Sequence, residues 1–156
     1  MEVQLLIDNR PLDGEGGKTF ERRNPVSGDT VTRSAAASVA DAAKAAESAG
    51  VAFKSWSQTG PTERRRVLLA AADKLEAKIG DISQAMAAEV GASGLWGGFN
   101  VMAAANLIRE AASLTTQIQG ETIPTDKPGA ISMTVRQPVG VVLSICLLYT
   151  SPSPRD

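Results

Sequence analysis

Residues 137–145, Gln-Pro-Val-Gly-Val-Val-Leu-Ser-Ile, are the stretch on which the expected fold depends. Their apolar side chains follow one another almost without interruption, which is typical of a strand covered on both faces inside an α/β sheet. The apolar run from Val139 to Tyr149 is too short to cross a bilayer. We therefore expect an α/β protein whose first buried strand covers residues 140–145.

The segment before this stretch has a different pattern. Apolar and polar side chains alternate from Ile131 to Arg136, which predicts a half-buried strand. The residues from Pro124 to Gly129 form a loop by composition. Near the start of the chain, short strands are predicted over residues 3–7, 18–22 and 30–33.

Three main helices are predicted between these strands. Ser38 and Asp41 have the spacing of a capping box, so the first helix should begin at Val39. Its apolar positions recur at three- and four-residue spacing and end before the Gly60-Pro61 pair.

The second helix is predicted from residue 61, because proline suits the first turn of a helix. It is expected to kink or restart at Gly80 and to end at Gly91. The third is predicted over residues 99–118, where apolar side chains again have helical spacing.

Composition excludes several classes of function. Apolar residues make up 43% of the chain and charged residues 21%, which is ordinary for a globular protein. The net charge of -1 gives no general attraction to nucleic acid or to an anionic membrane, so neither is expected as a partner. The absence of histidine removes Ser-His triads and most zinc sites, and no metal site is expected. The N-terminus lacks the features of a signal peptide, so we expect a cytoplasmic protein.

Two segments imitate functional motifs. Gly14 to Thr19 resembles a phosphate-binding loop, but Leu12 stands where that motif needs a glycine, and a hairpin loop is the better interpretation. The three arginines at 64–66 lie near acidic residues on the same predicted helix and are interpreted as a solvated face.

The segment from Leu95 to Asn100 is less ordinary, because it places two large aromatic residues beside two glycines. Trp96 lies three residues before Phe99 and four before Asn100, so all three can share one helix face. Glycines in this position would let a flat ligand or a second backbone approach closely. On spacing alone, core packing remains the favoured explanation.

Several segments together resemble the N-terminal part of the NAD(P)-dependent aldehyde dehydrogenase superfamily, and the resemblance runs from about Leu5 to Ile145. The resemblance rests on the order and spacing of four segments, namely Asn24-Pro25 with Gly28-Asp29, Phe53 to Trp56, Arg64 to Leu75 and residues 137–145. The segments Leu95–Val101 and Arg109–Thr116 look most like the salicylaldehyde and vanillin dehydrogenase branch.

The resemblance implies that the parent enzyme oxidises an aldehyde, of aromatic type, to the carboxylic acid with NAD or NADP. A cysteine thiolate, a glutamate and an oxyanion-binding asparagine perform this chemistry in the family. The asparagine belongs to a Pro-Trp-Asn motif, whose positions hold Leu147, Leu148 and Tyr149 here, and the family's Gly-Gln-x-Cys setting does not occur. Cys146 is therefore not the family's nucleophile, and no catalytic residue is expected in this chain. Residues 146–156 are interpreted as a non-native read-through tail, similar to one reading frame of a transposon-end adapter.

Further roles are also implied by the resemblance. Trp96, Phe99 and Asn100 would line the tunnel through which the aldehyde enters. Ser144 and Ile145 would lie at the sheet edge that borders the cofactor, and 140–145 would begin the dinucleotide-binding sheet. Residues 131–138 would supply a strand of the arm that joins subunits, so the parent enzyme is expected to be a homo-oligomer.

A different class of function remains open at this point. The chain could be a complete, non-catalytic helical interaction module whose apolar helix stripes are docking surfaces. A buried strand without a partner at its end argues against a module. A gene that reads on into Pro-Trp-Asn would support the enzyme, and a stop codon soon after Asp156 would support the module.

Overall fold

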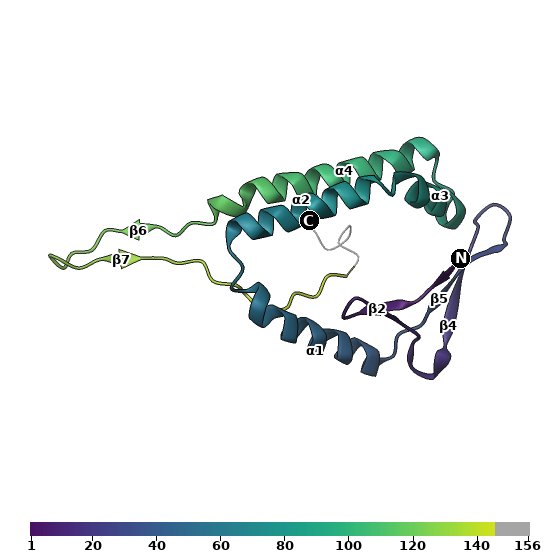
Figure 1. Ribbon diagram of the computed structural model, residues 1–156, viewed down its shortest axis with the longest axis horizontal. Coiled ribbons are helices and arrows are strands. Elements are labelled where there is room, and N and C mark those ends of the chain that lie inside the picture. The colour runs from purple at the N-terminus through teal and green to yellow at the C-terminus, as the bar shows by residue number, and fades with distance from the viewer. Residues whose placement is uncertain (146–156) are drawn as a thin grey trace.

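The computed structural model describes residues 1–145, and four α-helices make up most of it (Figure 1). The helices are α1 (Val39–Trp56), α2 (Pro61–Glu76), α3 (Ile79–Val90) and α4 (Gly94–Ser113), with short 3-10 helices η1 (Glu15–Gly17) and η2 (Leu114–Gln117). The strands are β1 (Glu2–Val3), β2 (Leu5–Ile7), β3 (Arg10–Leu12), β4 (Thr19–Arg23), β5 (Thr30–Ala35), β6 (Thr122–Ile123) and β7 (Ser132–Met133). The mixture of helices and short strands confirms the α/β class.

The N-terminus of α1 is closed by the predicted capping box. The Ser38 hydroxyl accepts a hydrogen bond from the Asp41 backbone N–H at 3.1 Å, and the Asp41 carboxylate accepts one from the Ser38 N–H at 3.0 Å. The same carboxylate oxygen also accepts the backbone N–H of Glu15 at 2.8 Å. Asp41 is buried, and it therefore joins the η1 loop to the first turn of α1.

These hydrogen bonds give stability a definite dependence on pH. The N–H groups of Glu15 and then Ser38 lower the pKa of Asp41 below its ordinary value of 3.8, because they stabilise the charged carboxylate. A carboxyl group whose pKa is lower in the folded than in the unfolded protein stabilises the fold at pH values above its unfolded-state pKa. This stabilisation is lost as the pH falls through its folded-state pKa. In the full-length protein, Asp41→Asn should lower the thermal midpoint near neutral pH and lower it less in acid, below about pH 4. Asp126→Asn on an exposed loop is the control, and a penalty for Asp41→Asn that is independent of pH would contradict the assignment.

The structure has four α-helices, because the interruption expected near Gly80 separates α2 from α3. The predicted second helix ends at Glu76, and α3 begins at Ile79 with Asp81 in its first turn, where a negative charge favours a new helix N-terminus. The last predicted helix begins earlier than expected, at Gly94. The Ser93 hydroxyl accepts the Trp96 backbone N–H at 3.2 Å, so a side-chain cap outweighs the low helix propensity of the following glycines.

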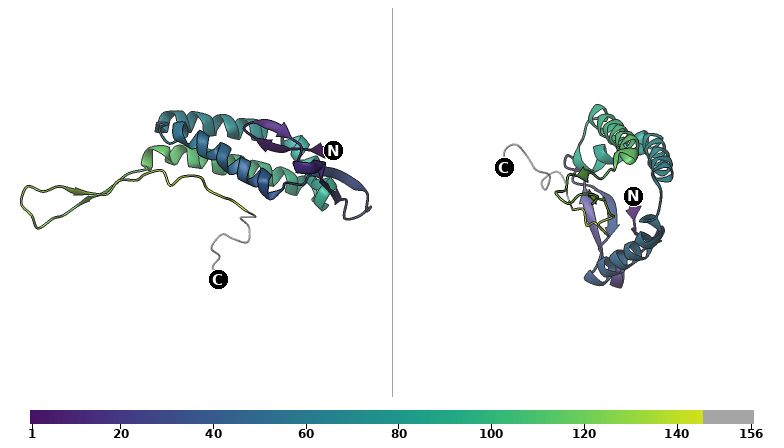
Figure 2. Two further views of the ribbon diagram at one scale, coloured as in Figure 1. Left: turned by 90° about the horizontal axis from the view of Figure 1, so that it is seen from below. Right: turned by 90° about the vertical axis from the view of Figure 1, so that its left-hand side faces the viewer.

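The largest helical unit is formed by α2, α3 and α4, in which α4 lies beside both α2 and α3, while α1 stands apart from them in Figure 1 and in the right-hand view of Figure 2. Its core consists of small side chains, namely Ala72, Val101, Ala105 and Ala112, each exposed by 2% or less. Arg109 of α4 ties the unit together, because it donates hydrogen bonds to Glu76 and to Asp73 of α2. These two carboxylates, Glu76 above all, raise the pKa of Arg109.

The N-terminal strands form a three-stranded sheet of order β1-β5-β4, in which β1 is parallel and β4 antiparallel to β5. The turn between β4 and β5 is attached to the end of α3. The Asn24 amide donates to the Ala88 carbonyl at 3.0 Å, and the Thr32 hydroxyl donates to Glu89 at 2.6 Å. The Asn24 side-chain oxygen also accepts the N–H groups of Val26 and Ser27, which forms the turn that the composition of residues 24–29 predicts.

The strands predicted near the end of the described chain form only in part. β7 pairs with β6 in a two-residue ladder, and the hairpin projects far beyond the helices (Figures 1 and 2). The buried strand predicted over residues 140–145 is not formed, and Val139 and Leu143 are 89% and 81% exposed. A strand needs a neighbour for its backbone hydrogen bonds, and none of residues 1–145 pairs with this segment.

The expectations for Cys146 and for the tail 146–156 lie outside the described residues. Within residues 1–145, no helix has both the length and the apolar character that crossing a membrane would require.

Candidate functional site

The first turns of α4 bring together three of the residues that the sequence singled out. The rings of Trp96 and Phe99 are stacked, with centroids 5.3 Å apart and planes inclined by 22°. The Asn100 amide donates to the Trp96 backbone carbonyl at 2.8 Å, which holds this side chain against the same part of the helix. We refer to Trp96, Phe99 and Asn100 as the aromatic wall.

The aromatic wall faces outward. Trp96 is 55% exposed and Phe99 is 58% exposed, while Asn100 is half-buried. Residues 1–145 therefore do not bury these rings in a core. Two stacked rings on an open surface leave one aromatic face free to meet another flat group.

The two glycines inside α4 have different surroundings. Gly97 is buried, and a Cβ atom added to it would lie 2.9 Å from the Cα, Cβ and Oγ atoms of Ser83 on α3. At Gly98 the nearest such atom would be a methyl carbon of Ile79 at an ordinary 3.8 Å. The sequence left open whether the glycines admit a flat ligand or a second backbone, and Gly97 admits the backbone of α3. A glycine inside a helix costs about 1 kcal/mol of stability relative to alanine, and at position 97 the close approach of Ser83 requires it.

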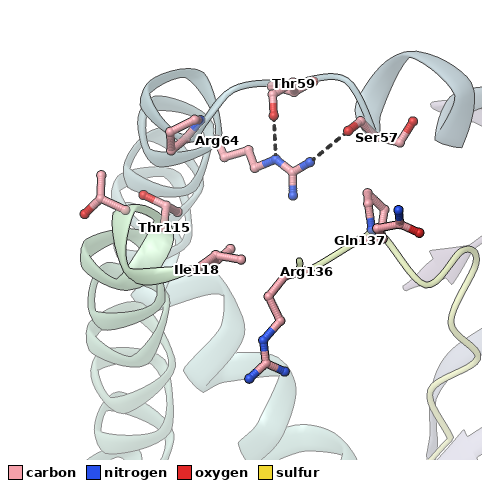
Figure 3. A pocket seen from close by; sticks show the side chains of 10 residues that line it. Ser57, Thr59, Arg64, Thr115, Ile118, Arg136 and Gln137 are labelled. Atoms are coloured by element: carbon pink, nitrogen blue, oxygen red, sulfur yellow. Dashed lines mark hydrogen bonds between the residues drawn. The ribbon is translucent and has the colours of Figure 1, made fainter. Parts of the chain in front are cut away.

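A pocket of about 470 Å³ lies where the α1–α2 turn faces the segment that follows the β6–β7 hairpin (Figure 3). It is lined by Ser57, Thr59, Pro61, Arg64, Thr115, Thr116, Ile118, Arg136, Gln137 and Pro138. No cysteine, histidine or carboxylate is among these residues, so the lining offers hydrogen-bond donors and positive charge but no nucleophile with its base.

Arg64 is the residue of this pocket whose role the sequence interpretation missed. Its guanidinium donates to the carbonyls of Thr59 at 2.8 Å, Trp56 at 3.2 Å and Ser57 at 3.4 Å, and it lies 5.5 Å from the centre of the Trp56 ring. These carbonyls belong to the end of α1 and the turn after it, where orphan acceptors and the helix dipole favour a cation. Arg64 therefore clamps the end of α1, and it does not belong to a solvated face.

The signal that could have identified this clamp is the short linker between two helices. Only residues 57–60 separate α1 from α2, so an arginine in the first turn of α2 has to lie near the last carbonyls of α1. Figure 3 shows the Arg64 side chain directed toward Ser57 and Thr59, whereas the Arg136 side chain points away from them.

Ser144 and Ile145, expected at the sheet edge that borders the cofactor, do not lie on a regular element, unlike the residues of the aromatic wall. Both are exposed and lie on the segment after Pro138 that belongs to no helix or strand. Within residues 1–145, no group of three or more histidine, cysteine, aspartate or glutamate side chains is arranged to hold a metal ion.

Comparison with known proteins gives matches over nearly all of the described chain. The model of the aldehyde dehydrogenase family matches residues 12–146. A salicylaldehyde dehydrogenase from Pseudomonas sp. (strain C18) is 59% identical over 145 residues, which are 93% of this chain and 30% of the relative. A vanillin dehydrogenase from Pseudomonas fluorescens is 51% identical over 145 residues, with the same coverage of 93% and 30%.

A solved structure is similar as well. The crystal structure of a salicylaldehyde dehydrogenase from Pseudomonas putida G7, complexed with salicylaldehyde, superposes with a TM-score of 0.87 and is 58% identical. The match covers 90% of this chain and 29% of that one. This chain thus spans about 30% of the length of the curated relatives that it matches.

Proposed function

The chain belongs to the aldehyde dehydrogenase family, and from this premise we propose that it is part of an enzyme that oxidises an aromatic aldehyde to the carboxylic acid. The substrate would be of the salicylaldehyde, vanillin or benzaldehyde type, and the hydride acceptor would be NAD or NADP. The observation that carries this proposal is the outward-facing stack of Trp96 and Phe99. The family membership argues against a non-catalytic interaction module.

The contribution of this chain would be to guide the substrate. An exposed indole face can stack on a flat aromatic ring, which is worth about 0.5–1.5 kcal/mol beyond the apolar area that the contact buries. A short aliphatic aldehyde has no ring and gains none of this stacking. The aromatic wall would therefore favour benzaldehyde-type substrates on their way to the nucleophile.

The chemistry itself requires groups that this chain does not supply. Ser144 and Ile145 lie exposed on an irregular segment, so the described residues do not by themselves form a cradle for the dinucleotide. We propose that Ser144 and Ile145 join the cofactor site only in the full-length enzyme, where residues 140–145 would become a strand of the cofactor sheet. The catalytic thiolate, glutamate and oxyanion asparagine would also come from the remaining length of the parent enzyme.

The oligomeric state and location follow as part of the same proposal. The β6–β7 hairpin projects beyond the helices and carries exposed Ile131, Met133 and Val135, which supports a role for residues 131–138 in joining subunits of a homo-oligomer. Such an exposed apolar strand would be protected by pairing with another subunit. A cytoplasmic location is the expectation that accompanies this proposal.

Replacing the indole tests the substrate class directly. Trp96→Ala in the full-length enzyme should lower kcat/KM for benzaldehyde about threefold to tenfold relative to kcat/KM for a short aliphatic aldehyde, because only the aromatic ring loses a stacking partner. The measurement is steady-state kinetics on both substrates with the same enzyme preparation.

The matched control is the other tryptophan. Trp56 lies beside Arg64 at the end of α1, so Trp56→Ala should lower thermal stability without changing the ratio of the two kcat/KM values. An equal loss on both substrates in Trp96→Ala would show that the indole only fills space, and the aromatic substrate class would lose its main support.

A further inference from the structure

The inference concerns the contact between α3 and α4 that lies behind the aromatic wall. Gly97 is buried against Ser83, and its hydrogen atom occupies a place where a methyl group would lie 2.9 Å from three Ser83 atoms. One of these is the Cα atom, so the obstruction includes backbone and cannot be relieved by a side-chain rotation alone. The first turns of α4 are thus as close to α3 as a glycine allows.

The same turn of helix carries the wall. In an α-helix each residue is rotated by about 100° from the one before, so Trp96 lies about 100° and Phe99 about 160° from Gly97 around the axis. The buried residues of α4 follow one another along one side of the helix at four-residue spacing, from Gly97 through Val101 to Ala105. One side of α4 therefore packs on its neighbours, and the side turned away from this contact presents the two rings.

We propose that Gly97 is a positioning residue, which sets how far the aromatic wall stands from α3 and hence where the wall meets an aromatic substrate. This inference rests on the proposed function of the wall. The substrate class concerned is a flat aldehyde whose ring must fit beside Trp96 and Phe99, and Gly97 itself touches no substrate.

The physical argument is that close-packed helices transmit a small insertion as a rigid displacement. Contacts between carbon atoms are comfortable near 3.5–4.0 Å, so a methyl at position 97 would push α4 outward by roughly 0.5–1 Å. The push is directed away from α3, toward the side on which the rings stand. A misplacement of about 1 Å in a substrate-positioning element can cost up to about a hundredfold in rate.

The experiment compares two neighbouring glycines in the full-length enzyme. Gly97→Ala should lower kcat/KM for benzaldehyde on the order of tenfold, mainly through KM, and should change kcat/KM for a short aliphatic aldehyde less than about twofold. Gly98→Ala adds the same methyl to the same helix with only an ordinary contact to Ile79, so the ratio of the two values should stay as in the wild type.

A second pair of variants shows whether the effect passes through the wall. If it does, adding Gly97→Ala to Trp96→Ala should change the substrate ratio little further, because the positioned ring is already gone. Moving the glycine to the other helix, as Gly97→Ala with Ser83→Gly, removes two of the three obstructing atoms and should restore part of the aromatic preference. The double variant also keeps the test decisive if Gly97→Ala alone does not fold.

The outcomes separate this inference from the proposed function. If the wild type and Trp96→Ala show the same substrate ratio, the aromatic substrate class itself fails. If Trp96→Ala lowers the ratio but a folded Gly97→Ala enzyme behaves like Gly98→Ala, the role of Gly97 is refuted while the substrate class stands. Full additivity with Trp96→Ala, no recovery in the Ser83→Gly double variant, or loss of folding in both Gly97→Ala variants would also overturn it.

Discussion

Incubated with an aromatic aldehyde and NAD or NADP, the 156-residue chain alone is expected to form no reduced cofactor above a blank. The sequence contains no histidine, and its one cysteine, Cys146, does not stand in the family's Gly-Gln-x-Cys setting. The lining of the pocket beside Arg64 provides no carboxylate to act as a general base. Without a thiolate, a base and an oxyanion donor, each of which contributes several powers of ten to such a reaction, the loss should be complete.

The measurement is the spectrophotometric assay of NADH or NADPH with the chain and with the full-length enzyme under the same conditions. The full-length enzyme provides the positive control. Aldehyde-dependent reduction by the short chain that disappears when a residue within 1–156 is replaced, Cys146 included, would refute the prediction. Activity that survives every such replacement would instead indicate a contaminating enzyme.

The second large effect concerns folding: the chain alone is expected to show no cooperative thermal transition and to bind ANS strongly. Among residues 1–145, the buried apolar side chains are the small ones of the α2–α4 unit, and no large side chain is fully buried. Large apolar side chains such as Leu95 and Val139 are instead 87% and 89% exposed. At about 25 cal/mol for each Å² of apolar surface buried, so small a core stabilises the chain too little to offset its conformational entropy.

Three measurements on the isolated chain test this expectation together. Calorimetry should give a broad transition or none, ANS fluorescence should rise as it does with molten globules, and size-exclusion chromatography should show association through the open apolar faces. The full-length enzyme, in which these faces would be covered, should unfold cooperatively and bind little ANS. A monodisperse monomer of the short chain with a sharp calorimetric transition would overturn the prediction.

The parts of the fold that could be predicted are those determined by neighbours in the sequence. The capping box of Ser38 and Asp41 depends on residues three apart, and it sets the start of α1 correctly. The turn at Asn24 is likewise formed by hydrogen bonds to residues two and three further on. In contrast, the strand expected over residues 140–145 depends on partner strands elsewhere, and sequence pattern alone cannot show whether a given chain provides them.

The candidate site was predictable to the same extent. Helical periodicity alone places Trp96, Phe99 and Asn100 together, whichever residue begins α4. The outward orientation of the rings could not be predicted, because it depends on which side of α4 packs against α3. The close contact of Gly97 with Ser83 determines that side, and these residues are 14 positions apart on separate helices.

The attachment of the β4–β5 turn to α3 has a consequence for the order in which the chain assembles during synthesis. The strands leave the ribosome first, but the Asn24 amide reaches the Ala88 carbonyl, 64 residues later, and Thr32 reaches Glu89, 57 residues later. The β4–β5 hairpin therefore lacks its partner residues until α3 has been made. Within the α2–α4 unit the contacts span fewer residues: 14 between Ser83 and Gly97, and 33 and 36 between Arg109 and the carboxylates of Glu76 and Asp73. We expect the helical unit to form first, and the N-terminal strands to dock onto it only after α3 has been synthesised.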